Sequence, residues 1–151
     1  MKKISISLLL IALLSFDLTA QTFEFQIVTV IESIVPNGLG RSRMISANAE
    51  RDFEAFTSEQ TEEDNSRNKS KRNEIRVKDF EETKLLNFFN IGGIRFQNIA
   101  SNDAVVTSKL NSMSEAGWEL TFVNSGVESY GGQGDDNGIF VTRYLFRRPK
   151  Q

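Results

Sequence analysis

The chain has 151 residues, a hydrophobic content of 39% and a formal net charge of −2, and it contains no histidine and no cysteine. Without histidine, serine–histidine and cysteine–histidine nucleophile systems are excluded, and a zinc site loses both of its preferred ligands. Without cysteine there is no disulfide and no acceptor for bacterial lipid attachment. The length is that of one domain, and the near-neutral charge predicts no binding to nucleic acid.

The first twenty residues have the pattern of a cleavable export signal. Two lysines are followed by an apolar run over residues 4–16 and by a small-residue cleavage site before Gln21. The run is too short for a membrane span. Cleavage leaves 16 basic and 19 acidic residues, a net charge of −3. We therefore expect a secreted or periplasmic protein that is not a lipoprotein, with residues 1–20 as signal peptide and 21–151 as a single domain without a membrane span.

The exported part begins with a strand over residues 23–35, in which apolar and polar side chains alternate. A Pro-Asn-Gly turn ends this strand, and the glycine-rich stretch after it contains Arg41 and Arg43. Guanidinium groups beside exposed backbone N–H groups suit an anion, so both arginines are candidate ligand-binding residues. The stretch lacks the third glycine of a dinucleotide fingerprint and the lysine of a P-loop. An edge strand around residues 44–45, with arginines that pair or are solvated, explains the same pattern.

Residues 47–74 differ in composition from the rest of the chain. Phe53 and Phe56 are followed by a run without any large apolar side chain, in which acidic residues come first and basic residues after. Such a segment buries too little surface to offset the entropy of its ordering, which predicts a mobile tip over residues 58–73. A solvated loop and a charged docking arm are both consistent with this pattern.

Three short elements are expected next. Residues 75–77 alternate as a short strand, and residues 80–90 are dense in apolar side chains, which favours a short helix, with extended structure as the alternative. After a Gly-Gly break, residues 94–99 alternate as a further strand.

The main helix is expected at about residues 103–116, where Asn102 or Asp103 can cap its first turn. Its apolar residues recur at spacings of four and three, which places one stripe against the rest of the fold. The stripe consists of Val106, Leu110 and Met113.

A helix end and a strand start are predicted at Gly117 and Trp118. Gly117 suits the left-handed position that ends a helix, and Trp118 then packs against Met113. These three residues are therefore interpreted as structural. Trp118, Leu120 and Phe122 are expected to alternate onto one strand face beneath the helix.

The last strand, residues 139–146, is expected to pair with residues 118–124 across a long glycine-rich loop. Both of its faces are apolar, which implies an interior strand or one covered on both sides. Arg143 interrupts one of these faces. It is a candidate anchor for an anionic ligand, or it pairs across the sheet with Glu119 or Glu24.

No residue is nominated as catalytic, as a metal ligand or as a cofactor ligand. Asp135 and Asp136 lie in the glycine-rich loop and offer oxygen ligands to Ca²⁺, but their spacing fails the EF-hand pattern and turn chemistry explains them equally well.

The residues 109–120, then a variable loop, then residues 144–148, resemble a family of small uncharacterised bacterial domains. That family has a helix, a Gly-Trp-Glu-Leu core and a closing strand that ends in Lys/Arg-Arg. The resemblance covers residues 22–33 and 103–149, so residues 37–99 form an insertion. The export signal and its cleavage junction are similar to those of secreted proteins of the Bacteroidetes type. The family carries no established activity, so the resemblance implies no catalytic residue.

These patterns predict an α+β fold with a small antiparallel sheet of three or more strands, one main helix packed on one face, and a charged, partly disordered insertion. The expected function is that of a secreted or periplasmic non-enzymatic binding or interaction module. It would bind an unknown protein partner or self-associate through a strand edge. A small enzyme that uses carboxylates and arginines on an anionic or glycan substrate, and a structural accessory of an envelope assembly, are the alternatives.

Overall fold

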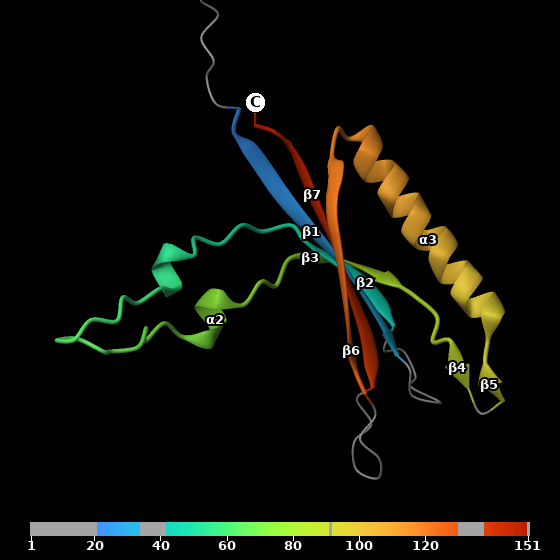
Figure 1. The fold of residues 1–151 in the computed structure, drawn as a ribbon, viewed down its shortest axis with the longest axis horizontal. Coiled ribbons are helices and arrows are strands. Elements are labelled where there is room, and N and C mark those ends of the chain that lie inside the picture. Colours follow the sequence, from blue (N-terminus) through green and yellow to red (C-terminus); the bar gives the residue numbers. More distant parts are fainter. Residues whose placement is uncertain (1–20, 34–41, 91, 130–137, 151) are drawn as a thin grey trace, which may run out of the picture.

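The computed structural model describes residues 21–33, 42–90, 92–129 and 138–150. Five antiparallel strands form one sheet in the order β3-β2-β1-β7-β6, and the helix α3 packs on one face of it (Figure 1). The fold is therefore α+β, as the sequence predicts. The elements of this sheet and helix are β1 (Phe23–Ser33), β2 (Arg43–Ala47), β3 (Phe80–Lys84), α3 (Phe96–Glu115), β6 (Glu119–Glu128) and β7 (Ile139–Pro149).

Smaller elements lie outside this sheet. A two-stranded ladder pairs β4 (Phe89–Asn90) with β5 (Gly93–Ile94), just before α3. A 3-10 turn, η1 (Glu54–Phe56), and one helical turn, α2 (Arg72–Ile75), lie in the charged segment. Within the described ranges, no helix is long and apolar enough to cross a membrane.

The sheet has two different faces, which the register of β1 and β7 defines. Directly paired residues of antiparallel strands place their side chains on the same face. Val28 pairs with Tyr144 and Ile27 pairs with Leu145, so even-numbered residues of both strands share one face and odd-numbered residues share the other. We call the even-numbered side, on which α3 packs, the covered face, and the odd-numbered side the open face.

The hydrophobic core lies between α3 and the covered face. Phe146 and Val28, both 1% exposed, are its most deeply buried side chains. Partly buried residues of α3, together with Trp118 and Tyr144, pack around them. The buried core consists of Val28, Val30, Met44, Leu85, Met113 and Phe146.

The helix α3 begins earlier than predicted, at Phe96, and the strand expected at residues 94–99 is wrong for most of that range. Asn102 therefore does not cap the helix but lies buried within it. Its side-chain Oδ1 accepts from the Leu86 N–H at 2.8 Å, and its Nδ2 donates to the Leu86 carbonyl at 2.7 Å and to Glu32 at 2.8 Å. The polar residue that resembled a cap instead fixes the helix to the chain that leaves β3.

The residues before α3 also differ from the prediction. The expected helix at residues 80–90 is wrong, because residues 80–84 form β3 and pair with β2 at the sheet edge. The predicted strand at residues 75–77 is also wrong: Ile75 ends α2, whose first turn is closed by Glu74, which accepts from the Lys71 N–H at 2.9 Å. Pairing with β2 at residues 80–84, and the cap of α2 at residues 71–75, determine the local structure more strongly than the spacing of apolar residues does.

The end of α3 has the geometry that the sequence predicts. Gly117 has φ +81°, its N–H donates to the Ser114 carbonyl at 2.9 Å, and the Trp118 N–H donates to the Met113 carbonyl at 3.0 Å. These two bonds form a Schellman cap. In β6, however, a bulge between Leu120 and Phe122 changes the register. Leu120 pairs with Phe146 and Phe122 with Leu145, so the expectation that both lie beneath the helix is wrong.

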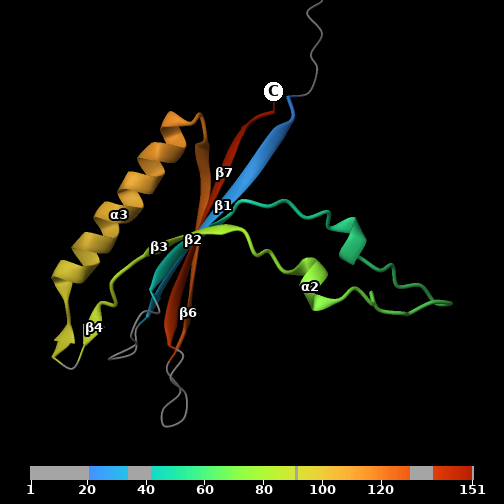
Figure 2. The same ribbon diagram turned by 180° about the vertical axis from the view of Figure 1, so that it is seen from behind.

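Residues 48–79 form an arm that leaves the sheet after β2 and returns at β3. The Asn48 N–H donates to the Asp79 carbonyl at 3.3 Å and closes its base. The arm extends away from the sheet on the side opposite α3 (Figures 1 and 2). It contains η1 and α2 but no buried residue, while the predicted mobility of residues 58–73 stays a prediction.

Candidate functional site

The open face is apolar although α3 packs on the other side of the sheet. Phe25 is 61% exposed, Phe122 is 62% exposed, and Ile27 is 49% exposed. Other apolar side chains of the same face are half-buried between their strand neighbours. A two-layer fold normally presents polar side chains on its outer sheet face, so this face is a candidate interaction surface. The set consists of Phe23, Phe25, Ile27, Ile31, Ile45, Phe80, Phe122, Ile139, Val141 and Leu145.

Ion pairs lie at the two margins of the open face. Arg147 bonds to Glu119 at 2.8 Å on the β6 side, and its guanidinium lies 4.8 Å from the centre of the Phe23 ring. Arg43 bonds to Glu82 at 2.8 Å on the β3 side. Charged groups thus border the apolar side chains at both margins, as a polar rim borders the core of protein–protein interfaces, and one further charge, Arg143, lies on the face itself.

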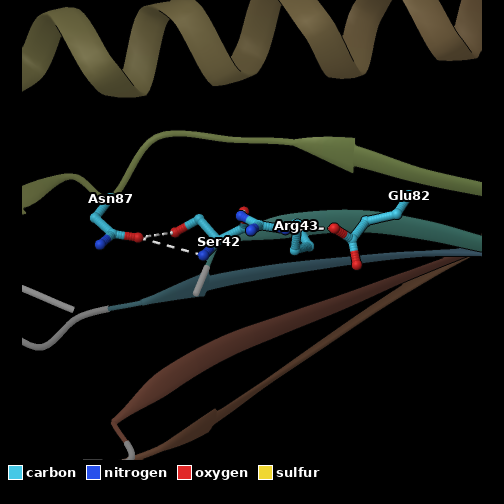
Figure 3. A network of polar contacts seen from close by, with 4 residues as sticks. All are labelled: Ser42, Arg43, Glu82 and Asn87. Atoms are coloured by element: carbon cyan, nitrogen blue, oxygen red, sulfur yellow. Dashed lines mark hydrogen bonds and ion pairs between the residues drawn. The ribbon is translucent and has the colours of Figure 1, made fainter. Parts of the chain in front are cut away.

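Arg43 belongs to a polar network that holds three segments together (Figure 3). Its guanidinium also donates to the Ser42 carbonyl at 2.8 Å, and the Ser42 hydroxyl donates to Asn87 Oδ1 at 2.6 Å. The same hydroxyl accepts from the Ser33 N–H at 3.0 Å. These bonds connect β1, β2 and the chain after β3, so Arg43 already has partners that a ligand would have to replace.

Arg143 lies exposed on the open face, opposite Thr29 on β1 and Asn124 on β6. The cross-sheet pairing predicted for it is wrong, because Glu119 pairs with Arg147 and Glu24 pairs with Arg148. Arg43 and Arg143 share the open face but lie two strands apart, a separation of at least about 10 Å. Arg41 lies outside the described residues, as do Asp135 and Asp136. Ligand binding by these arginines stays a prediction.

A groove of about 650 Å³ opens where the arm leaves the sheet. It is lined by residues 24–27 of β1, by residues 47–51 at the base of the arm, and by Trp118. The Arg148 guanidinium lies over the Trp118 ring, 4.4 Å from its centre, and Arg148 also forms an ion pair with Glu24. The groove thus extends the open face around the edge of β1.

The edge of β1 in this groove has backbone groups that a further strand can pair with. The Thr22 carbonyl accepts from the Lys150 N–H at 2.9 Å, so the backbone groups of Thr22 point toward the β7 side. Because successive residues of an antiparallel strand alternate between neighbours, Phe23 and Phe25 direct their N–H and C=O groups to the β2 side. The β2 ladder reaches no further along β1 than Val28, so these groups face the groove.

Two titratable groups with shifted pKa values, Glu81 and Tyr144, lie on the helix side of the fold, and a third, Asp64, lies on the arm, where hydrogen bonds from Ser66 lower its pKa. The hydrogen bond and charge of Lys109, 2.8 Å away, lower the pKa of Glu81. Burial raises the pKa of Tyr144, as do the charges of Glu32 and Asp103. Among the residues that the structure describes, no group of three or more acidic side chains is placed to hold a metal ion.

Sequence reasoning did not identify Phe25, Ile27 and Phe122 as candidate site residues. The signal was present, because both faces of the first and last strands carry apolar residues. Such strands are expected to be covered on both sides. In the described chain, α3 covers one side of them, and the second side is the open face.

Neither a family model, nor a curated protein, nor a solved structure matches the chain. The resemblance to the family of small bacterial domains therefore stays a prediction.

Proposed function

We propose that this protein is an exported, non-enzymatic interaction module that binds another polypeptide through its open face. The observation that carries the proposal is the exposure of Phe25, Ile27 and Phe122 on one face of the sheet. Exposed apolar area of this kind, bordered by charged groups, favours association because its burial removes apolar surface from water.

The shape of the surface favours a polypeptide over a small molecule. Small-molecule sites are enclosed and bury most of the ligand, whereas the open face is broad and the adjoining groove is open to solvent. The backbone groups of Phe23 and Phe25 offer hydrogen bonds that an extended chain satisfies. The sheet face and the strand edge therefore suit the same class of partner.

Site-specific photo-cross-linking tests this function. A photoreactive amino acid replaces Phe25 or Phe122 in the full chain, which is expressed in cells that export it. We expect cross-links from both positions to a polypeptide. The matched control places the same amino acid at Asn111, which is exposed on α3, and we expect no product there. Equal or absent cross-linking at all three positions contradicts the proposal.

A further inference from the structure

We propose that the partner that covers the open face is a second copy of this chain, which packs face to face so that each arm lies alongside the other protomer. This inference rests on the proposed function and specifies its partner. It joins two features, the apolar open face and the arm, that no other element of the described residues packs against.

The size of the open face matches what a stable dimer needs. Strand spacings of about 4.8 Å and a rise of about 3.3 Å per residue give the five strands about 650 Å² of face per protomer. Two such faces bury about 1,300 Å² in total, within the range of roughly 1,200–2,000 Å² found in stable interfaces. Contacts with the arm add to this area.

The position of the arm agrees with a second sheet on the open face. Packed sheets lie about 10 Å apart, and the arm extends from the sheet on the side of the open face (Figures 1 and 2). A second sheet at that distance therefore lies beside the arm. A two-fold axis makes the two contacts identical, so each arm lies beside the sheet of the other protomer.

The arm has local structure and exposed apolar side chains. Asn68 Nδ2 donates to the Ala55 and Thr57 carbonyls at 3.1 and 3.2 Å, which connects the outgoing and returning legs. Yet Phe53 is 73% exposed and Ile75 is 49% exposed. Among the described residues, hydrogen bonds connect the two legs of the arm, but its apolar side chains are not buried. A second protomer would provide the surface that buries them.

The charges of the arm are self-complementary between two copies. The outgoing leg, residues 50–64, has seven acidic residues and one basic residue, while the returning leg, residues 67–78, has six basic residues and one acidic residue. None of the ion pairs found among the described residues involves the arm. A two-fold axis is compatible with a contact between the acidic leg of one arm and the basic leg of the other, a complementarity that two copies of this chain supply without an unrelated partner.

Sedimentation equilibrium of the exported protein, purified from cells that express the full chain, tests this inference. We expect a reversible dimer. Phe25→Lys and Phe122→Lys on the open face each raise the dimer dissociation constant at least about 30-fold, because each replaces a large exposed aromatic ring of the interface with a charge. Phe53→Lys on the arm raises it by roughly 5-fold or more. The matched control is Phe96→Lys on α3, which is 76% exposed and is expected to change the constant by less than about 3-fold.

The outcomes separate this inference from the proposed function. A wild-type protein that stays monomeric up to its solubility limit overturns the dimer, as does a dimer that persists in Phe25→Lys and Phe122→Lys. If Phe25 still cross-links to a different polypeptide in either case, the interaction module stands and its partner is not a second copy. If Phe25 cross-links to nothing, both proposals fail. Circular dichroism and thermal unfolding of each variant confirm that it is folded, so that a lost dimer reports on the interface.

Discussion

The two faces of one sheet differ in what lies on them rather than in how apolar they are. On the covered face, Phe146 and Val28 are each 1% exposed beneath α3. On the open face, Phe25 and Phe122 are of the same chemical kind and more than half exposed. The contrast teaches that strand composition specifies how much surface must be covered, while the part of the chain that the structure describes covers one side. The second side is where an interaction is expected.

Core truncation gives the largest expected difference between the faces. Phe146→Ala removes a fully buried ring and leaves a cavity, so we expect the free energy of unfolding to fall by about 3–5 kcal/mol. Phe25→Ala, measured at a concentration where the chain is monomeric, is expected to change it by less than about 1 kcal/mol. Denaturant unfolding measures both values. A similar loss for the two variants would show that the open face is packed within the protomer.

The attachment of α3 gives the next largest effect. Asn102→Ala removes three hydrogen bonds and leaves the Leu86 backbone groups without their partner. We expect a loss of about 2–3 kcal/mol in the free energy of unfolding. Asn111→Ala, on the exposed side of the same helix, serves as the control and is expected to stay within about 0.5 kcal/mol. Equal effects would mean that α3 is held by apolar packing without this contact.

The helix cap gives a smaller effect. Gly117 has φ +81°, so Gly117→Ala is strained even though nothing lies within 4 Å of the added carbon. We expect a loss of about 1 kcal/mol in the free energy of unfolding. Gly126→Ala in β6 also meets nothing within 4 Å but needs no positive φ, and we expect it to be neutral within about 0.5 kcal/mol. Thermal unfolding of the two variants distinguishes the cost of a positive φ from any steric cost of the added methyl group.

The smallest expected effect is that of the ion pair between Lys109 on α3 and Glu81 on β3. Because this exposed pair lowers the pKa of Glu81 below its ordinary value of 4.5, its stabilisation is fully present above that pH. It is lost as the pH falls through the lower pKa of the folded state. Lys109→Met is expected to reduce the free energy of unfolding by about 0.5 kcal/mol at neutral pH and by nothing at about pH 2. An unchanged difference at both pH values would rule out the ion pair as its cause.

The sequence predicts well what local chemistry determines. The alternation in the first and last strands, the stripe of α3 and the cap at Gly117 correspond to the structure. The predictions are wrong where contacts with residues distant in the sequence determine the local structure. Residues 80–84 become a strand because β2 offers an edge, and Asn102 is buried because Leu86 and Glu32 take its hydrogen bonds.

The candidate site was the least predictable part. Alternation shows that a strand has two apolar faces, but which face α3 covers depends on contacts distant in sequence. The bulge in β6 then moves Phe122 to the side opposite Leu120, a change that no residue pattern near it signals. Of the arginines singled out in the sequence, Arg43 lies at the β3 margin of this surface and Arg143 lies on it, while its exposed apolar side chains belong to strand residues without any motif.

Thiol labelling tests most directly whether the open face is covered by a polypeptide. The chain contains no cysteine, so Phe25→Cys, Phe122→Cys and Phe96→Cys each introduce a single thiol. In intact cells that express the full chain, we expect the two open-face thiols to react at least about 10-fold more slowly with a soluble maleimide than the thiol on α3. After unfolding in urea, we expect all three thiols to react at similar rates. Equal rates at all three positions in the folded protein would contradict the account.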